Sequence, residues 1–408
     1  MEVLALILAG GKGSRLDILS NRRSKPAMPF AGKFRIIDFC LSNLTHSNIM
    51  DVAIFTQYQP LSLNEHIGAG KPWDFDRRNT SITLLQPHNY WYSGTADAVL
   101  KNLEFIERRD PKYILILSGD HIYKMDYQKM LAEHIKKNAQ LTVACINVDP
   151  SETNRFGIME TNSDGEVVNF IEKPKHTTST LASMGIYLIN FDVLKTSLLN
   201  ATELNLDFGK HIIPKLVKCN ETKVLSHPFV GYWKDVGTYD SYLETNLDLA
   251  KGELDLDLHD PKWRIYTKSE DLPPVRFGKH ANVSNSLISN GCVIEGTVIN
   301  SVLSPGVYVG KGSVIKNSVI MNNTVISENV HIDYSILDKR VVVGRNVIIG
   351  QGEVTNSNLI KPDVLSSGIN VIEKKTIIPN DVIITRNVRV LESGTFKSKL
   401  IKVGETVE

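Results

Sequence analysis

Cysteine is scarce in this sequence, and the few cysteines form no recognisable pattern. Four are spread over 408 residues, at Cys40, Cys145, Cys219 and Cys292. None forms a C-x-x-C pair, and none is grouped with histidine at the spacing of zinc ligands. This scatter excludes a disulfide framework and a structural zinc site, and we expect four reduced, buried thiols.

Long hydrophobic runs are also missing. No segment approaches 18 consecutive apolar residues, which excludes a membrane-spanning helix. The apolar start, Val3 to Leu8, is too short for a signal-peptide core, lacks a basic region before it and ends in glycines. We therefore interpret it as a first β-strand and expect a cytoplasmic protein.

The chain has no excess of charge of either sign. Lys and Arg number 46 against 45 Asp and Glu, for a formal net charge of +1. A global field that would attract nucleic acid or an anionic membrane is therefore excluded, and neither is expected as a partner. Any binding of phosphate must come from charges placed locally. The length predicts two or three domains.

Aromatic residues are rare in the carboxyl-terminal part of the chain. Residues 281–360 contain two aromatics, eleven Asn and 26 Val or Ile, whereas all four Trp precede residue 264. Aliphatic residues recur there every five to six positions, with Gly and Asn between them at places that suit left-handed corners. This hexapeptide spacing predicts a parallel β-helix rather than a β-sandwich, whose strands are longer and richer in aromatics.

The first part of the chain has a different pattern. Short apolar runs rich in β-branched residues alternate with amphipathic stretches of helical length, such as Ala96 to Ile106 and Tyr127 to Ile135. This alternation predicts an α/β domain around a mostly parallel sheet, with functional residues at the carboxyl ends of strands. We place a catalytic domain at 1–250, a linker at 251–280 and the β-helix at 281–408.

A glycine-rich loop follows the first predicted strand. Gly10, Gly11 and Gly13 would let main-chain N–H groups approach phosphate oxygens, with a helix pointing its amino terminus at the same anion. Leu16 stands where a dinucleotide fingerprint needs glycine, and no Gly-Lys pair is followed by Ser or Thr, so a Walker A loop is excluded. We interpret the loop, with Arg15 and Lys25, as a triphosphate site; the alternative is a purely structural turn.

Two aspartates are candidate metal ligands. Asp120 directly follows a predicted buried strand, Tyr113 to Leu117, and Asp235 lies in the segment YWKDVGT. Two carboxylates together with substrate phosphates suit Mg²⁺, which prefers oxygen ligands. A turn or helix cap is the alternative for either aspartate alone.

These motifs together resemble a known family. The string LAGGKGSRL, the following KP and the segment GKFRIIDF resemble the sugar-1-phosphate nucleotidyltransferases, and GDH at 119–121 favours the ADP-glucose pyrophosphorylase branch over thymidylyl and uridylyl relatives. Further blocks occur in the family's order, namely WYSGTADAV, SGDHIYKMDY, FGIM, EKP, ASMGIY, DFGKHIIP and YWKDVGT. The resemblance implies a Rossmann-like nucleotidyltransferase domain, built on a mostly parallel mixed sheet, followed by a left-handed parallel β-helix.

The resemblance also implies the reaction and its residues. ATP and glucose 1-phosphate would give ADP-glucose and pyrophosphate by Mg²⁺-dependent in-line transfer, which would supply glycogen synthesis. Arg15 and Lys25 would hold phosphates, and Asp120 and Asp235 the metal. The other expected contacts are Leu8, Ala9, Gly10, Gln57 and Gln86 for the nucleotide, and Tyr92, Gly157, Glu172, Lys173 and Ser183 for the sugar phosphate.

Regulation and assembly are implied in the same way. The resemblance predicts a homotetramer and a phosphorylated effector held between the domains by Arg22, Arg23 and Arg35. Arg22 stands where Lys is familiar, so the identity of the activator stays open. His121 is expected to order its loop and His331 to point outward. Two alternatives are a non-catalytic regulatory subunit and a pyrophosphorylase for another nucleotide or sugar.

Overall fold

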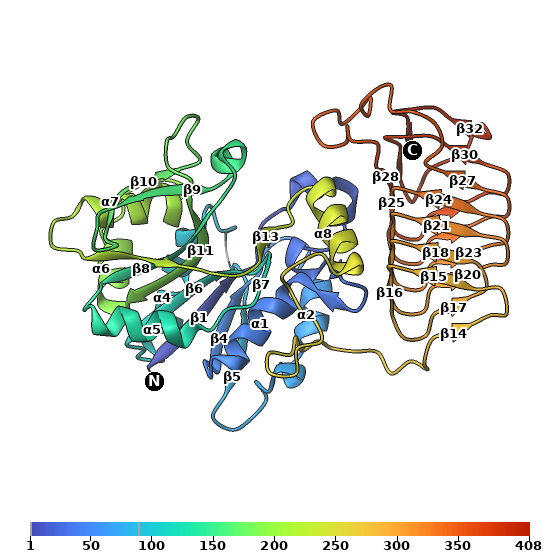
Figure 1. Ribbon diagram of the computed structural model, residues 1–408. Helices are drawn as coiled ribbons and strands as arrows, with labels where there is room; N and C mark the ends of the chain where they lie inside the picture. The colour runs from blue at the N-terminus through green and yellow to red at the C-terminus, as the bar shows by residue number, and fades with distance from the viewer. Residues whose placement is uncertain (1, 89) are drawn as a thin grey trace.

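The amino-terminal part of the chain forms an α/β unit around one mixed sheet (Figure 1). A computed structural model describes residues 2–88 and 90–408. The central strand β1 (Val3–Leu8) lies between β4 (Asp51–Phe55) and β6 (Tyr113–Ser118), and both are parallel to it. β11 (Leu181–Asn190) runs antiparallel to β6 and to β8 (Leu141–Asn147). The α/β prediction is confirmed.

The other elements of this unit complete the sheet, the small ribbons and the covering helices. The strands are β2 (Pro29–Phe30), β3 (Phe34–Arg35), β5 (Ser81–Leu85), β7 (His121–Tyr123), β9 (Gly157–Thr161), β10 (Val167–Glu172), β12 (Val224–Pro228) and β13 (Trp233–Asp235). The helices are α1 (Ile36–His46), α2 (Leu61–Ile67), α3 (Thr95–Lys101), α4 (Leu103–Glu107), α5 (Tyr127–Lys136), α6 (Phe191–Leu199), α7 (Ile213–Lys218) and α8 (Tyr239–Lys251). The short 3₁₀ and π turns are η1 (Ser14–Ser20), η2 (Lys25–Ala27), η3 (Lys71–Trp73), η4 (Pro150–Arg155) and η5 (Phe208–Ile212).

The central strands are apolar on both faces because both faces are covered. Ala5 and Ile7 of β1 join one core cluster with residues of α1, whereas Leu4 and Leu6 join a second cluster with residues of α3, α6 and α7. Successive side chains of a strand point to opposite faces, so the unbroken apolar run of β1 supplies both cores. This covering leaves the carboxyl ends of the strands as the free edge at which a site can form.

Three local expectations were wrong. The stretch Ala96 to Ile106 is two helices, because the Asn102 side chain donates to the carbonyl of Ala98 at 2.8 Å and the backbone leaves the helical region there. The segment after the glycine loop is a 3₁₀ turn, η1, interrupted at Asp17, and not an α-helix. Cys219 is exposed, since it follows the end of α7 at the surface, while the other three cysteines are buried as expected.

The chain between α8 and the repeat packs on the α/β unit. In residues 252–275, all of which the structure describes, there is no helix or strand. Leu256 and Ile265 are buried, and the indole N–H of Trp263 donates to the side-chain oxygen of Asn43 at 2.9 Å. The first strand of the repeat, β14, begins at Arg276, inside the range predicted as a linker.

The carboxyl-terminal part is a parallel β-helix whose three faces are separate ladders of parallel strands (Figure 1). The first ladder contains β14 (Arg276–Phe277), β17 (Val293–Ile294), β20 (Tyr308–Val309), β23 (Val325–Ile326), β26 (Val342–Val343) and β29 (Ile377–Ile378). The second contains β15 (Asn282–Ser284), β18 (Thr297–Ile299), β21 (Val314–Lys316), β24 (His331–Asp333), β27 (Ile348–Ile349), β30 (Ile383–Ile384) and β32 (Leu400–Ile401). The third contains β16 (Leu287–Ile288), β19 (Val302–Leu303), β22 (Val319–Ile320), β25 (Ser335–Leu337), β28 (Asn370–Ile372), β31 (Arg389–Val390) and β33 (Thr406–Val407).

The corners of the coil explain the excess of asparagine. Asn300 and Asn317 lie one coil apart with φ of 45° and 46°, in the left-handed region that asparagine tolerates. The amide of Asn300 donates to the side chain of Asn317 at 2.7 Å, and Asn317 donates to Asp333 at 2.9 Å. His331 is exposed, as expected. The predicted β-helix is confirmed, and no helix in the described residues is long and apolar enough to cross a membrane.

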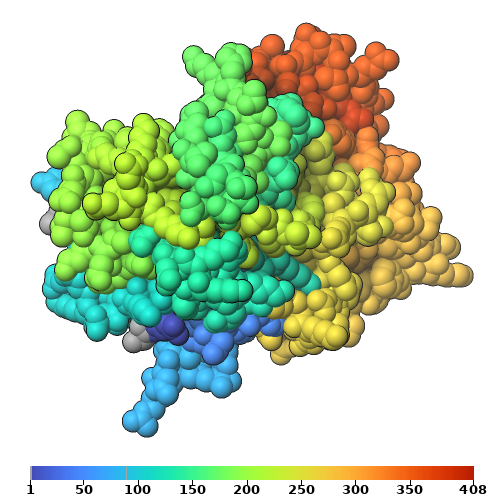
Figure 2. Space-filling model, turned by 60° about the vertical axis from the view of Figure 1, so that its left-hand side comes forward, coloured from blue at the N-terminus to red at the C-terminus, as the bar shows by residue number. Residues whose placement is uncertain are grey.

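The two units share one apolar core. A single cluster joins Leu16, Phe30 and Tyr242 of the first unit to Val319 and Ile336 of the β-helix. α8 packs against β19 and β22 of the third ladder. Figure 1 shows α8 facing the side of the coil that carries β16, β25 and β28 of the same ladder. In the space-filling view of Figure 2 the β-helix, drawn in orange to red, lies directly against the α/β unit. The β-helix is therefore in position to influence the loops that follow β1.

Candidate functional site

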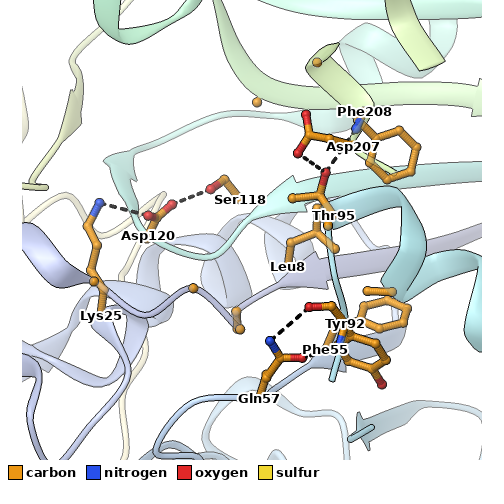
Figure 3. A pocket seen from close by; sticks show the side chains of 18 of the residues that line it. Leu8, Lys25, Phe55, Gln57, Tyr92, Thr95, Ser118, Asp120, Asp207 and Phe208 are labelled. Carbon is orange, nitrogen blue, oxygen red and sulfur yellow. Dashed lines mark hydrogen bonds and ion pairs between the residues drawn. The ribbon is translucent and has the colours of Figure 1, made fainter. Parts of the chain in front are cut away.

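A cleft of about 670 Å³ opens at the carboxyl ends of β1, β4 and β6. The glycine loop and Arg15 line one end together with Lys25 and Asp120, and Figure 3 shows the last two across the cleft from Asp207 and Phe208. Glu172 and Lys173 line the end near Asp207 and Gly209. Of the residues predicted from the sequence, the cleft is lined by Leu8, Ala9, Gly10, Gly11, Gly13, Arg15, Lys25, Gln57, Tyr92, Asp120, Glu172 and Lys173. This is the place at which open α/β sheets bind ligands.

The two predicted metal ligands come together through a small antiparallel ribbon. β13 pairs with β7 so that Asp235 lies opposite His121, next to Asp120 at the end of β6. Ligand atoms of Asp120, His121 and Asp235 all lie within 4.8 Å of one another. The buried Nδ1 of His121 has no hydrogen-bond partner among the residues that the structure describes, and two carboxylates are the oxygen donors that a hard divalent cation prefers. The residues therefore fit the metal implied by the sequence.

Lys25 lies between the two carboxylates. Its Nζ is 2.8 Å from Oδ2 of Asp120 and 2.5 Å from Oδ1 of Asp235. Burial on its own would lower the pKa of Lys25, but the two carboxylates outweigh burial and raise its pKa. Burial likewise opposes ionisation of Asp120, yet Lys25 and His121 hold the pKa of its carboxyl well below the ordinary value. The pKa of the Asp235 carboxyl is lowered by Lys25 as well, so Lys25, Asp120 and Asp235 are all charged at neutral pH.

The position of Asp235 depends on a residue that the sequence reasoning missed. Nη2 of Arg155 lies 3.2 Å from Oδ2 of Asp235, and Nη2 of Arg15 lies 3.7 Å from the same oxygen. Arg155 also bonds Glu152 at 2.6 Å within η4. The only available signal was its place directly before the FGIM block.

The opposite end of the cleft is built around Glu172. Gly157 pairs with Glu172 across β9 and β10, and a Cβ at Gly157 would lie 2.9 Å from Oε2 of Glu172. A Cβ at Gly209 would lie 2.5 Å from the same oxygen. Any side chain at either glycine would collide with the Glu172 carboxylate in this position. Burial raises the pKa of the Glu172 carboxyl. Nζ of Lys173 lies 3.4 Å from Oε1 of Glu172.

Two side chains from outside the predicted set, Thr95 and Asp207, support this end, and the predicted Ser183 lies behind it. The hydroxyl of Thr95, at the start of α3, donates to Asp207 at 2.9 Å, and Asp207 caps η5 (Figure 3). Ser183 is buried on β11 and donates to the hydroxyl of Tyr187 at 3.3 Å, so it supports the cleft without lining it. Thr95 and Asp207 lie in sequence blocks that the family resemblance had already identified.

The two glutamines expected near the base differ in their surroundings. Nε2 of Gln57 donates to the carbonyl of Tyr92 at 3.2 Å, and its Oε1 accepts from the N–H of Tyr92 at 2.6 Å (Figure 3). Gln57 therefore holds the main chain of Tyr92 in place. Gln86 follows β5, is exposed and does not line the cleft.

The three arginines expected at one effector site lie in different surroundings. Arg35 lines a second cleft of about 460 Å³ between the two units, together with Lys33, Lys268 and Lys339. Arg22 forms an ion pair with Glu392, and Arg23 is buried against Asp338, both of the β-helix. Neither Arg22 nor Arg23 lines the second cleft.

Comparisons with known proteins agree with this geometry. The family model described as "Nucleotidyl transferase" matches residues 4–252, and the one described as "GlmU-like, C-terminal hexapeptide" matches residues 273–372. A protein of Thermosipho melanesiensis named glucose-1-phosphate adenylyltransferase is 47% identical over 417 residues, covering 100% of each chain. Proteins of the same name from Acetivibrio thermocellus and Clostridium perfringens are 46% and 52% identical, over 95% and 77% of this chain and 92% and 83% of their own lengths.

Proposed function

The chain belongs to the glucose-1-phosphate adenylyltransferase family of nucleotidyl transferases, and on that premise we propose that it transfers the adenylyl group of ATP to glucose 1-phosphate. As a member of that family it is a nucleotidyltransferase. One observation carries the proposal: a single cleft is lined by Lys25 and Asp120 at one end and by Glu172 and Lys173 at the other, and Lys25 also contacts Asp235 directly behind the first end. Those two ends suit a triphosphate and a sugar phosphate.

The reaction needs charge neutralisation more than proton transfer. A phosphate oxygen of glucose 1-phosphate attacks the α-phosphorus of ATP, the new O–P bond forms, and the bond to the β-phosphate breaks to release pyrophosphate. Arg15 and the N–H groups of the glycine loop face the leaving phosphates. Lys173 holds the phosphate of the sugar, and Glu172 accepts hydrogen bonds from its hydroxyls.

The metal in this proposal is Mg²⁺. Enzymes of this family generally use a divalent metal, and Asp120 and Asp235 would hold it here. When bound, such an ion offsets the repulsion between the two reacting phosphates. Lys25 lies within ion-pair distance of both carboxylates and also lines the cleft, so its ammonium is placed to contact a phosphate of the nucleotide.

Regulation and assembly belong to the same proposal. The second cleft, with Lys33, Arg35, Lys268 and Lys339, has the positive charge that a phosphorylated effector requires. We assign Arg35 to the effector site, while the ion pairs of Arg22 and Arg23 suit a structural role better. A homotetramer, the domain division at 250 and 280, a cytoplasmic location and a role in glycogen synthesis remain predictions.

The test is an assay of pyrophosphate release from ATP and glucose 1-phosphate with Mg²⁺. The purified chain should be active, and Asp120→Asn should lower kcat by on the order of a thousandfold, because charge stabilisation at the reacting phosphates is lost. Asp164→Asn, on an exposed turn, is the matched control and should keep wild-type activity. An Asp120→Asn protein that retains most of its kcat would contradict the metal assignment.

The same assay separates the alternatives. Replacing ATP by UTP, GTP or dTTP identifies the nucleotide, and a faster reaction with any of these would assign the chain to another sugar nucleotide. A chain that is inactive alone and becomes active with a second homologous subunit would be a regulatory subunit. Retention of Arg15, Lys25, Asp120 and Asp235 argues against that outcome.

A further inference from the structure

The segment between the glycine loop and Lys25 is bound to side chains of the β-helix. Residues 17–25, which we name the phosphate-side segment, make four polar contacts across the boundary between the two units. These pairs are Asp17 with Arg389, Asn21 with Glu373, Arg22 with Glu392, and Arg23 with Asp338. The segment therefore has polar partners in the β-helix as well as in the α/β unit, where Lys25 contacts Asp120 and Asp235.

The partners come from one face of the coil. Asp338 directly follows β25, Glu373 directly follows β28, and Arg389 begins β31, and these strands are consecutive neighbours in the third ladder. Parallel stacking places equivalent positions of successive coils in a row. Asp338 and Glu373 follow paired strand residues and so occupy equivalent positions of successive coils, whereas Arg389 pairs with Val371 and lies two positions earlier in the next coil. Three neighbouring strands of one face thus present charged side chains to the phosphate-side segment.

At one end of the segment, Asp17 has a strained backbone. Its φ of 37° and ψ of −115° are unusual for any residue other than glycine. Oδ2 of Asp17 lies 2.7 Å from Nε of Arg389, with side chains 13% and 6% exposed. The next N–H, of Ile18, donates to the hydroxyl of Tyr239 at 3.2 Å. A strained conformation of this kind persists only where the surroundings hold it.

At the other end, Arg23 is fixed by a buried ion pair. Its Nη2 lies 2.7 Å and 2.6 Å from the two carboxylate oxygens of Asp338, and the side chains are 3% and 1% exposed. Removing one partner of such a pair would leave the other charge buried and unpaired. Two residues further on, Lys25 reaches Asp120 and Asp235.

The two fixed points, Asp17 and Arg23, lie close in sequence to the two cations at the triphosphate end of the cleft. Arg15 comes two residues before Asp17, and Lys25 comes two residues after Arg23. We propose that Arg389 and Asp338 of the β-helix are positioning residues for the reaction, which hold Arg15 and Lys25 in place for the triphosphate by fixing Asp17 and Arg23. This inference rests on the proposed function. It assigns the β-helix a direct part in nucleotide binding in addition to assembly.

A positioning role makes a selective prediction. Arg15 and Lys25 line the triphosphate end of the cleft, far along it from Glu172 and Lys173. Loosening the phosphate-side segment should raise KM for ATP and lower kcat, while KM for glucose 1-phosphate stays unchanged. A purely structural role would lower the melting temperature or the yield without this separation of the two substrates.

The chain offers a matched pair of variants. Nη2 of Arg386 lies 2.7 Å from Asp333 inside the β-helix, and the pair does not touch the phosphate-side segment. Arg389→Gln should raise KM for ATP on the order of tenfold, since small misplacements of binding groups have effects of that size or larger. Arg386→Gln should keep the wild-type constants. Arg389→Lys should recover part of the loss.

Binding provides a readout that does not need turnover. The dissociation constant of α,β-methylene-ATP, measured by isothermal titration calorimetry, should rise with Arg389→Gln and with Asp338→Asn and not with Arg386→Gln. If Arg389→Gln does not fold, Asp338→Asn and Asp17→Asn carry the same comparison. If the wild type lacks activity while Arg389→Gln and Asp338→Asn still bind the analogue more weakly than Arg386→Gln does, the proposed function fails and the positioning inference stands.

Three results would overturn the positioning role of Arg389 and Asp338. If the wild type is active and both Arg389→Gln and Asp338→Asn retain wild-type KM for ATP and wild-type affinity for the analogue, the inference is overturned. The same conclusion follows if these variants lower only the melting temperature, or if Arg386→Gln weakens ATP binding as strongly as Arg389→Gln does.

Discussion

At the scale of single residues, the charge of the cleft is set by a few close contacts. Lys25 contacts both Asp120 and Asp235, and Arg15 and Arg155 place two further cations beside Asp235. Lys25 and the two aspartates are charged because the attraction between them outweighs the cost of burial, which raises the pKa of Lys25 and lowers the pKa of both carboxyls. The chemistry of the cleft therefore depends on individual side chains whose substitution has selective effects.

Lys173 allows a test of the sugar-phosphate end. Its ammonium is exposed and has only Glu172 as an ionic partner in the cleft, so it is free to bind a phosphate. Lys173→Gln should raise KM for glucose 1-phosphate by on the order of tenfold to a hundredfold, with KM for ATP unchanged. Lys175→Gln, two residues away and exposed, is the control, and steady-state kinetics with each substrate varied in turn decides the outcome. An equal rise in both KM values would contradict the assignment.

Lys339 gives the second cleft a dependence on pH. Burial and the nearby Arg35 and Arg23 lower the pKa of Lys339 to about 7. The ammonium is therefore present below about pH 7 and lost above it, so the affinity for sulfate, whose charge is constant in this range, should fall as pH rises from about 6 to about 8. Lys339→Met should flatten that part of the profile measured by calorimetry. His66 and His259 also line the cleft, and a profile unchanged in the variant would assign the dependence to them.

The same shift has a consequence for stability. The folded pKa of Lys339 lies below the ordinary value of 10.5, so the unfolded state binds more protons between the two values. The contribution of Lys339 to the free energy of unfolding should therefore rise with pH from about 7 to about 10.5. The difference in unfolding free energy between the wild type and Lys339→Met, followed over that range, measures it.

At the scale of elements, the β-helix depends on its corners as much as on its strands. The strands are short, two or three residues each, so the turns between them decide whether the coil closes. Asn317 combines a left-handed backbone with hydrogen bonds to the coils on both sides. The ladder of corner amides thus links successive coils without contributing to the apolar core.

Two variants of Asn317 separate these contributions. Asn317→Gly keeps the permissive backbone and loses the hydrogen bonds, and should lower the free energy of unfolding by about 1 kcal/mol. Asn317→Ala loses the same hydrogen bonds and also forces alanine into the left-handed backbone conformation, which costs additional energy. It should lower the free energy of unfolding by about 2 to 3 kcal/mol. Denaturant unfolding monitored by circular dichroism measures both. Equal losses in the two variants would show that the backbone conformation does not matter at this corner.

At the scale of the whole molecule, the two units are not independent. The shared cluster buries Tyr242 and Phe30 of the first unit against Val319 and Ile336 of the coil. Gly32, with φ of 80°, lies so close to the β-helix that a Cβ there would be 2.5 Å from Oγ of Ser289. This close approach and the buried charge pairs make the boundary part of the folded core.

Truncation tests this dependence. A chain ending at Gly252 would expose the apolar face that α8 and the neighbouring residues present to the β-helix, and we expect it to aggregate or to melt well below the full chain. Differential scanning calorimetry of the full chain should show one cooperative transition for both units. A truncated chain with the melting temperature of the full-length protein would contradict the shared core.

The sequence by itself determined the two architectures and most residues of the cleft. Apolar periodicity, glycine and asparagine placement and the ends of buried strands are local properties, and these identified β1, the glycine loop, Asp120 and the repeat. The apolar pattern failed where a polar side chain competed with the backbone of its own helix, and where exposure depended on the rest of the fold. The hydrogen bond from the Asn102 side chain to the carbonyl of Ala98 ends α3 early. Cys219 is exposed because it lies at the surface.

Only the tertiary structure decided how the charges are paired. The ribbon of β7 and β13 brings Asp235 beside Asp120, and Lys25 then lies between them, although the three are far apart in the chain. The burial of Arg23 against Asp338 likewise depends on a coil that begins long after it. The physical reason is that a charged residue has the same local pattern whether it faces solvent, a ligand or a distant partner. Its role is set by which groups the fold brings within a few ångströms of it.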